Sequence, residues 1–167
     1  TTRAVWGDEG RNAAYERIRN EIAAGHRAFI VCPLIDPSDK LGVKSVEEES
    51  RRIASGPLRG LRIEMVHGRM TTSEKDEAMA KFANGDADIL VATTVVEVGV
   101  DVPLATVMLV EGAERFGLAQ LHQLRGRVGR STHPSFCFLA ASEDGLAFQR
   151  LRVMERTSDG FEVAEAD

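Results

Sequence analysis

The chain contains 167 residues, of which 43% are hydrophobic and 28% are charged, and its formal net charge at pH 7 is −5. This length is that of one ordinary globular domain, and apolar segments that recur from end to end exclude a largely disordered chain. No apolar run approaches the ~20 residues that a membrane-spanning helix needs, and no basic segment followed by an apolar one opens the sequence as a secretory signal would.

Apolar runs that favour β-strands alternate with segments of helical periodicity along the first half of the chain. Ala14, Ile18 and Ile22 fall on one face of a helix, and Gly25 suits the left-handed residue that commonly follows a helix end. Asp36–Val46 is polar and contains proline and glycine, so it is predicted to be an exposed loop. The elements predicted here are strands at Thr2–Trp6, Ala28–Cys32 and Leu61–Val66 and helices at Arg11–Ala24 and Val46–Ser55.

The same alternation continues through the second half. Thr71 and Glu74 have the spacing of a capping box, in which two side chains satisfy backbone amides at a helix start. The elements predicted here are strands at Ile89–Thr93, Thr106–Val110 and Phe136–Ala140 and helices at Thr71–Asn84, Gly117–Leu124 and Asp144–Arg156.

The predicted strands are continuously apolar, which is typical of parallel strands covered by helices on both faces. The sequence therefore predicts an α/β fold, a three-layer αβα sandwich with a mainly parallel sheet. Cys32 and Cys137 lie inside these runs, and we interpret them as buried thiols rather than as a disulfide or a metal site.

Three segments carry the candidate chemistry, and ligands of open parallel sheets bind at the carboxyl ends of strands. In the first, Val66–Met70, Gly68 would let a ligand approach the backbone closely, and the capped helix start beyond it offers amides to a phosphate. The alternative is a strand-to-helix turn that requires glycine.

The second segment is Ala92–Pro103. Thr93 and Thr94 end a buried strand, where hydroxyl groups can bond phosphate oxygens. Gly99 and Asp101 follow in the loop, where a carboxylate can accept hydrogen bonds from ribose hydroxyls. The alternative is that Asp101 caps a turn ahead of the proline.

The third segment, Gln120–Arg130, concentrates positive charge. Residues 115–130 contain four arginines and no acid, a charge of +4, which leaves −9 for the rest of the chain. A helical wheel separates the leucines from a polar stripe that contains Gln120, Gln123, Arg127 and Arg130. Paired guanidinium groups suit polyphosphates because they are permanently charged and bidentate. The alternative is a solvated arginine face.

The sequence lacks the glycine-rich G-x-x-x-x-G-K-[S/T] loop that would cradle phosphates, and it lacks an acidic pair placed to hold Mg²⁺ for ATP. It therefore has residues that assist phosphoryl transfer and lacks those that bind the nucleotide first. This combination predicts one half of a site shared between two lobes.

The three segments resemble, in order, motifs IV, V and VI of the second RecA-like domain of superfamily 2 helicases. Gln123–Arg130 matches the motif VI pattern Q-x-x-G-R-x-G-R. Within that superfamily, Val31–Ile35, His67–Met70, Ala92–Pro103 and Glu114–Arg130 resemble the RecG family of bacterial ATP-dependent DNA helicases, and the resemblance covers essentially the whole chain.

That resemblance implies a motor domain that acts on branched or duplex DNA in repair and recombination, in a monomeric protein of the bacterial cytoplasm and nucleoid. It implies that Arg127 and Arg130 are arginine fingers for ATP, bound with Mg²⁺ mainly on a first motor domain that this chain lacks. It also assigns Gly99, Asp101 and Gln123 to the nucleotide. The residues that it assigns to the nucleic acid are Gly68, Arg69, Thr93 and Thr94.

The resemblance further divides the chain into a RecA-like domain, residues 1–145, and the truncated start of a helical translocation motif, residues 146–167. The N-terminal motor and wedge domains of the same full-length protein are then the expected partners, and the isolated domain is expected to be inactive. Two alternatives stay open: the motor domain of a transcription-repair coupling translocase, which shares Gly117–Arg130 almost whole, and a non-catalytic module that binds nucleic acid.

Overall fold

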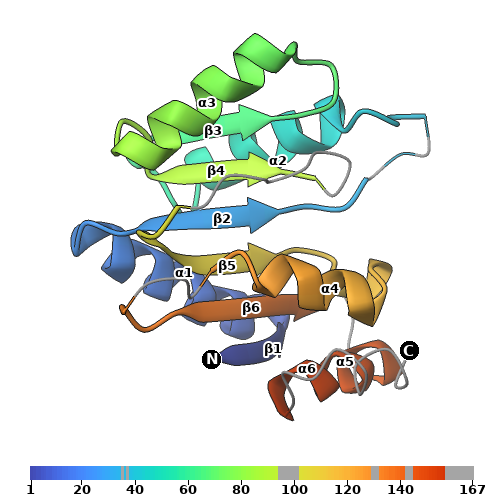
Figure 1. Ribbon diagram of the computed structural model, residues 1–167. Coiled ribbons are helices and arrows are strands. Elements are labelled where there is room, and N and C mark those ends of the chain that lie inside the picture. Colours follow the sequence, from blue (N-terminus) through green and yellow to red (C-terminus); the bar gives the residue numbers. More distant parts are fainter. Residues whose placement is uncertain (35, 37, 94–101, 129–131, 142–144, 157–167) are drawn as a thin grey trace.

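The computed structural model describes residues 1–34, 36, 38–93, 102–128, 132–141 and 145–156 (Figure 1). Six parallel strands form one sheet in the order β1-β6-β5-β2-β4-β3. The strands are β1 (Thr2–Trp6), β2 (Arg27–Val31), β3 (Ile63–Val66), β4 (Ile89–Ala92), β5 (Ala105–Val110) and β6 (Phe136–Ala141). The helices are α1 (Gly7–Ala23), α2 (Val43–Ala54), α3 (Thr72–Asn84), α4 (Leu118–Arg125), α5 (Leu146–Leu151) and α6 (Val153–Arg156), with a 3₁₀ turn, η1, at Ala113–Arg115.

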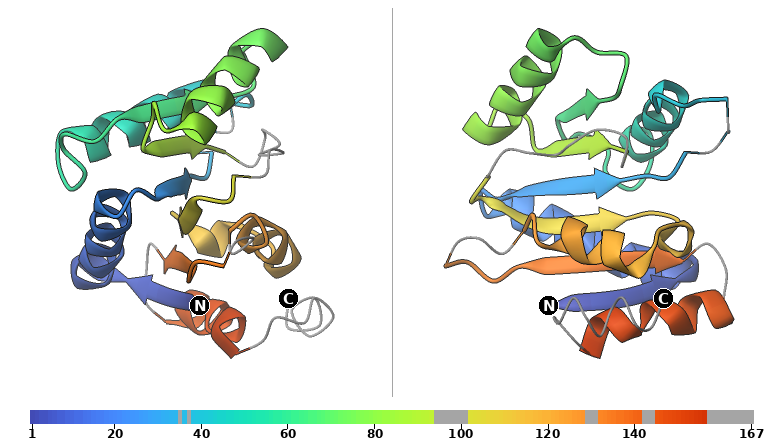
Figure 2. Two further views of the ribbon diagram at one scale, coloured as in Figure 1. Left: turned by 60° about the vertical axis from the view of Figure 1, so that its left-hand side comes forward. Right: turned by 45° about the vertical axis from the view of Figure 1, so that its right-hand side comes forward.

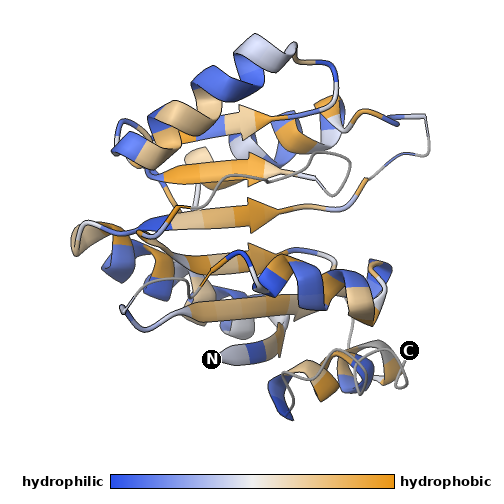
Figure 3. Ribbon diagram, viewed as in Figure 1, coloured by the Kyte–Doolittle hydropathy of each residue, from blue (hydrophilic) through white to orange (hydrophobic). Residues whose placement is uncertain are grey.

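Helices cover both faces of the sheet, as predicted (Figures 1 and 2). On one face, α1 and α2 bury apolar side chains such as Ile18 and Ile53 against the strands. On the other face, α3 and α4 do so through residues such as Phe82 and Leu121, and α5 and α6 join the same core. The inner strands β4 and β5 are hydrophobic along their length because both of their faces are buried, whereas the edge strands β1 and β3 also carry polar residues (Figure 3).

The helix after β1 begins four residues earlier than the periodicity predicts. Gly7 adopts a positive φ of 71°, which only glycine accepts readily, and so turns the strand directly into α1. Asp8 and Glu9 then occupy the first turn of the helix, where negative charge is favourable.

The predicted C-terminal helix is two short helices, α5 and α6, of which the second lies along the outer edge of β1. Glu155 of α6 accepts a hydrogen bond from the backbone amide of Ala4, at 3.1 Å. This bond satisfies an edge-strand donor that the sheet leaves unpaired. No helix within the described ranges is long and apolar enough to cross a membrane.

Candidate functional site

The first two candidate segments meet at the carboxyl edge of the sheet, beneath the chain between β2 and α2. The amide of Gly68, just beyond β3, donates a hydrogen bond to the carbonyl of Leu41 at 2.8 Å. Thr93, just beyond β4, is 1% exposed. Gly42 packs so closely on it that a Cβ on this glycine would lie 2.8 Å from Thr93 Oγ1. Gly68 and Thr93 are therefore brought together, and the same loop covers both.

The start of α3 is less open to a phosphate than the sequence indicates. The predicted capping box is present: Glu74 N donates to Thr71 Oγ1 at 3.1 Å, and Thr71 N donates to Glu74 Oε1 at 2.9 Å. The box uses two of the available amides and places a carboxylate beside the rest. The hydrogen bonds from Thr71 hold the pKa of Glu74 below its ordinary value, so this carboxylate stays ionised near neutral pH. Arg69, two residues before the cap, is exposed.

The third segment begins at the carboxyl edge and runs back across β5 and β6 (Figures 1 and 2). Leu118 and Leu121 are fully buried, and Gln123 is exposed on the opposite side of α4. The helix ends at Arg125, with Gly126 as its C-cap. This end is one residue from the predicted end at Leu124, so Arg127 follows the helix and the helical wheel does not describe its position.

Two neighbouring arginines of this segment differ in their contacts. Arg125 Nη1 donates to the carbonyl of Met154 in α6 at 2.6 Å, and its Nη2 lies 3.0 Å from Nδ1 of His122. Arg127 is partly exposed, and its guanidinium has no hydrogen bond or ion pair with any residue that the structure describes. Arg125 is thus a structural tie between α4 and α6, whereas Arg127 is available to a ligand.

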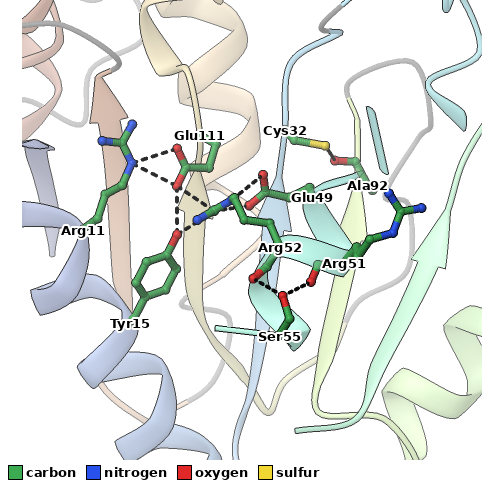
Figure 4. A network of polar contacts seen from close by, with 9 residues as sticks. All are labelled: Arg11, Tyr15, Cys32, Glu49, Arg51, Arg52, Ser55, Ala92 and Glu111. Atoms are coloured by element: carbon green, nitrogen blue, oxygen red, sulfur yellow. Dashed lines mark hydrogen bonds and ion pairs between the residues drawn. The ribbon is translucent and has the colours of Figure 1, made fainter. Parts of the chain in front are cut away.

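A buried polar network that sequence reasoning missed lies at the same sheet edge, on the α1 and α2 face (Figure 4). Glu111, the residue after β5, is 8% exposed and accepts hydrogen bonds from Arg11 Nε and from the Tyr15 hydroxyl at 3.3 Å. Arg52 of α2 donates to the Tyr15 hydroxyl at 2.7 Å and pairs with Glu49. Burial raises the pKa of Glu111, against the opposing charge of Arg11, and raises the pKa of Tyr15 to about 12.

The only sequence signal for this network is an acid, Glu111, directly after a fully apolar strand, because the partners of Glu111 lie far away in the chain.

Four predicted site residues lie outside the described residues: Thr94, Gly99, Asp101 and Arg130.

The sequence profile of the helicase conserved C-terminal domain family matches residues 12–132. The chain belongs to this family. The RecA-like fold predicted from the sequence is confirmed, because the structure of RecG bound to a three-way DNA junction superposes with a TM-score of 0.80 and 46% identity, covering 98% of this chain and 21% of that one.

Curated relatives of this helicase C-terminal domain include two RecG proteins named as ATP-dependent DNA helicases. The chain is 50% identical to RecG of Thermotoga maritima over 157 residues, which is 93% of this chain and 20% of that protein. It is 49% identical to RecG of Synechocystis sp. over 158 residues, 94% of this chain and 19% of that protein. The chain thus spans about a fifth of the length of the curated relatives it matches.

The same fold occurs in a more distant protein. The C-terminal domain of the DEAD-box protein Dbp5 has a TM-score of 0.63 at 16% identity, with 98% of this chain and 94% of that one covered. At this identity the similarity shows the fold alone.

Proposed function

We propose that this chain is the second motor lobe of an ATP-dependent DNA helicase or translocase similar to RecG. In this proposal the full-length protein acts on branched DNA, such as stalled replication forks and Holliday junctions, during repair and recombination. The family match, the RecG relatives and the relative whose structure contains a three-way DNA junction support the proposal.

The observation that carries the proposal is the contrast between Arg125 and Arg127. Internal hydrogen bonds occupy the first guanidinium, whereas the second has no partner in the described part of the chain. A permanently charged, planar group that is free to approach a second lobe is suited to a phosphate whose charge develops during transfer. We assign Arg127 as an arginine finger, together with Arg130.

The chain fits ATP as a contributor rather than as the main binding lobe. Gln123 in α4 is exposed and Arg127, two residues after the end of this helix, is partly exposed. With Gly99, Asp101 and Arg130 they would hold the nucleotide from this lobe. Bound ATP supplies a γ-phosphoryl group whose transfer to water releases free energy. In this proposal ATP is bound with Mg²⁺ mainly on the first lobe.

Nucleic acid would pass the carboxyl edge of the sheet, where Gly68, Arg69 and Thr93 lie, with Thr94 beside them in sequence. Closure of the two lobes around a nucleotide would shift this edge relative to the first lobe. The contacts between this edge and the phosphate backbone would then move along the DNA. Residues 146–167 would begin a helical element that couples the two events. The hydrogen bond from Arg125 to Met154, which joins α4 to α6, supports that coupling.

The test is the Arg127→Ala variant of the full-length protein. We expect DNA-stimulated ATP hydrolysis to fall by about 10³-fold or more, the effect typical of a lost arginine finger, while the affinity for a labelled DNA junction stays within about twofold. Arg59→Ala, which removes an exposed arginine from the turn before β3, is the matched control and should hydrolyse ATP normally.

Near-normal turnover of Arg127→Ala would overturn the finger assignment. DNA binding without any ATP hydrolysis by the unaltered full-length protein would favour the alternative of a non-catalytic module.

A further inference from the structure

Leu41 is one of the few large apolar side chains that the described surface exposes. Its side chain is 43% exposed, in the loop that connects β2 to α2. Single exposed leucines are common and need no explanation by themselves. This leucine differs because its backbone is fixed in place against two of the segments singled out from the sequence. We call residues 38–42 the Leu41 loop.

Gly68 packs against one side of this loop. The bond from its amide to the Leu41 carbonyl, described above, requires close approach of the two backbones. A Cβ on Gly68 would lie 2.9 Å from Leu41 Cδ2 and 3.2 Å from the Leu41 carbonyl oxygen. An alanine at position 68 would therefore displace the Leu41 side chain and shift the loop backbone by a few tenths of an ångström.

Thr93 and Asp39 fix the loop at its other end. Gly42, with a φ of 74°, turns the chain over Thr93 into α2. The carboxylate of Asp39 then accepts hydrogen bonds from Ser45 N at 2.9 Å and from Ser45 Oγ at 2.8 Å. Despite partial desolvation, these donors hold the pKa of Asp39 below its ordinary value. The Asp39 carboxylate therefore ties the loop to the first turn of α2.

Two cations belong to residues next to this backbone contact: Lys40 precedes Leu41, and Arg69 follows Gly68. Lys40 in the loop and Arg69 beside Gly68 are both exposed, and neither side chain has a hydrogen bond or an ion pair within the described ranges. An exposed apolar side chain with unpartnered cations on neighbouring residues suits a nucleic-acid strand, whose sugars and bases offer apolar faces between regularly spaced phosphates.

We propose that the Leu41 loop is a nucleic-acid contact element. In this proposal Lys40 and Arg69 pair with phosphates of the DNA backbone, and Leu41 packs on the apolar face of a sugar or base between them. Gly68 and Thr93 act through the loop, as positioning residues beneath it. The inference rests on the proposed function and deepens it, because it identifies which atoms at this sheet edge meet the DNA.

Binding of a fluorescein-labelled three-way DNA junction to the full-length protein, measured by anisotropy at several salt concentrations, separates the two kinds of contact. Lys40→Gln should lower the slope of log affinity against log salt by about 0.9, the loss of one phosphate contact. Leu41→Ala should weaken binding by about tenfold at every salt concentration, because it removes apolar burial and no charge.

Two matched variants serve as controls. Arg51→Gln removes an exposed cation two turns further along α2, and Leu146→Ala truncates a leucine that is 90% exposed on α5. Both should bind the junction like the unaltered protein. Wild-type affinity and salt slope in both Lys40→Gln and Leu41→Ala would overturn the inference and leave the proposed function intact. Failure of the unaltered protein to bind DNA would instead overturn the proposed function.

The Gly68→Ala variant tests the positioning role. It should weaken binding in the unaltered background and add little in the Leu41→Ala background, because both changes act on the same contact. If Gly68→Ala lowers the affinity for the junction by the same factor in both backgrounds, Gly68 contacts the DNA directly and its assignment as a positioning residue is wrong.

Discussion

Arg11 Nε lies 3.2 Å from Glu111 Oε2, although the two residues are 100 positions apart in the sequence. The same arginine donates through Nη2 to the carbonyl of Ala141, at 3.2 Å, so it joins the carboxyl ends of β5 and β6 to α1. Glu111 is also the first residue of the turn that leads through η1 into α4. The pair therefore fixes, from the opposite face, the place where the chain turns towards Arg127.

Replacement of Glu111 by alanine should lower the free energy of unfolding by about 3 kcal/mol, because it leaves the Arg11 guanidinium and the Tyr15 hydroxyl without their buried acceptor. Urea unfolding of the domain, followed by circular dichroism, measures the change. Glu48→Ala, on the exposed side of α2, is the control and should change stability by less than about 0.5 kcal/mol. Equal stability of the two variants would contradict a structural role for the network.

The capping box of α3 should make part of the stability depend on pH. The pKa of Glu74 is lowered from an ordinary value of 4.5, so its contribution is fully present above that value and is lost as the pH falls through the lower pKa of the folded protein. The melting temperature of Glu74→Gln should therefore lie below that of the unaltered domain at pH 7, and the gap should narrow towards pH 3. A gap that stays constant with pH would show that the charge of Glu74 contributes nothing.

Removal of the Thr71 hydroxyl gives an independent measure of how much the capping box of α3 stabilises the domain. Thr71→Ala should destabilise the domain by about 1 kcal/mol, the usual cost of removing an N-cap side chain. Thr72→Ala, one position further along and also exposed, is the matched control in the same thermal unfolding experiment and should cost only a few tenths of that amount. If both variants cost the same, the hydrogen bond to Glu74 N is not the source of the effect.

Arg125→Ala should loosen the C-terminal helices, because it removes the charged donor to the Met154 carbonyl. Such a bond contributes about 1.5–3 kcal/mol, so amide hydrogen exchange in residues 146–156 should speed up by about tenfold or more, while exchange in α3 stays unchanged. Hydrogen-exchange mass spectrometry of the domain measures both segments at once. Uniform acceleration over the whole chain would mean general destabilisation instead of a local tie.

The assignment of Arg127 to a phosphate makes a further prediction for a conservative change. Arg127→Lys keeps the positive charge and loses the planar fork, so the full-length protein should recover less than about a tenth of the ATP hydrolysis lost in Arg127→Ala. Recovery of most of the activity by lysine would show that charge alone is needed at this position.

Short-range patterns determined most of the fold. The strands were predictable because both of their faces are buried and their apolar runs are continuous, as in Ile89–Ala92. The capping box was predictable because Thr71 and Glu74 are three residues apart. The start of α1, which was predicted four residues too late, depends on the backbone angles of Gly7, and periodicity does not register such angles.

The sequence by itself also determined the family, since the string Gln123–Arg130 is local and specific. Only the tertiary structure showed that the contacts of Arg125 and Arg127 differ, because the acceptor of Arg125 is a backbone carbonyl 29 residues away. Likewise, only the folded chain brings Leu41 and Gly42 over Gly68 and Thr93. Contacts between distant segments depend on where parallel strands end at a common edge, and no local pattern of residues carries that information.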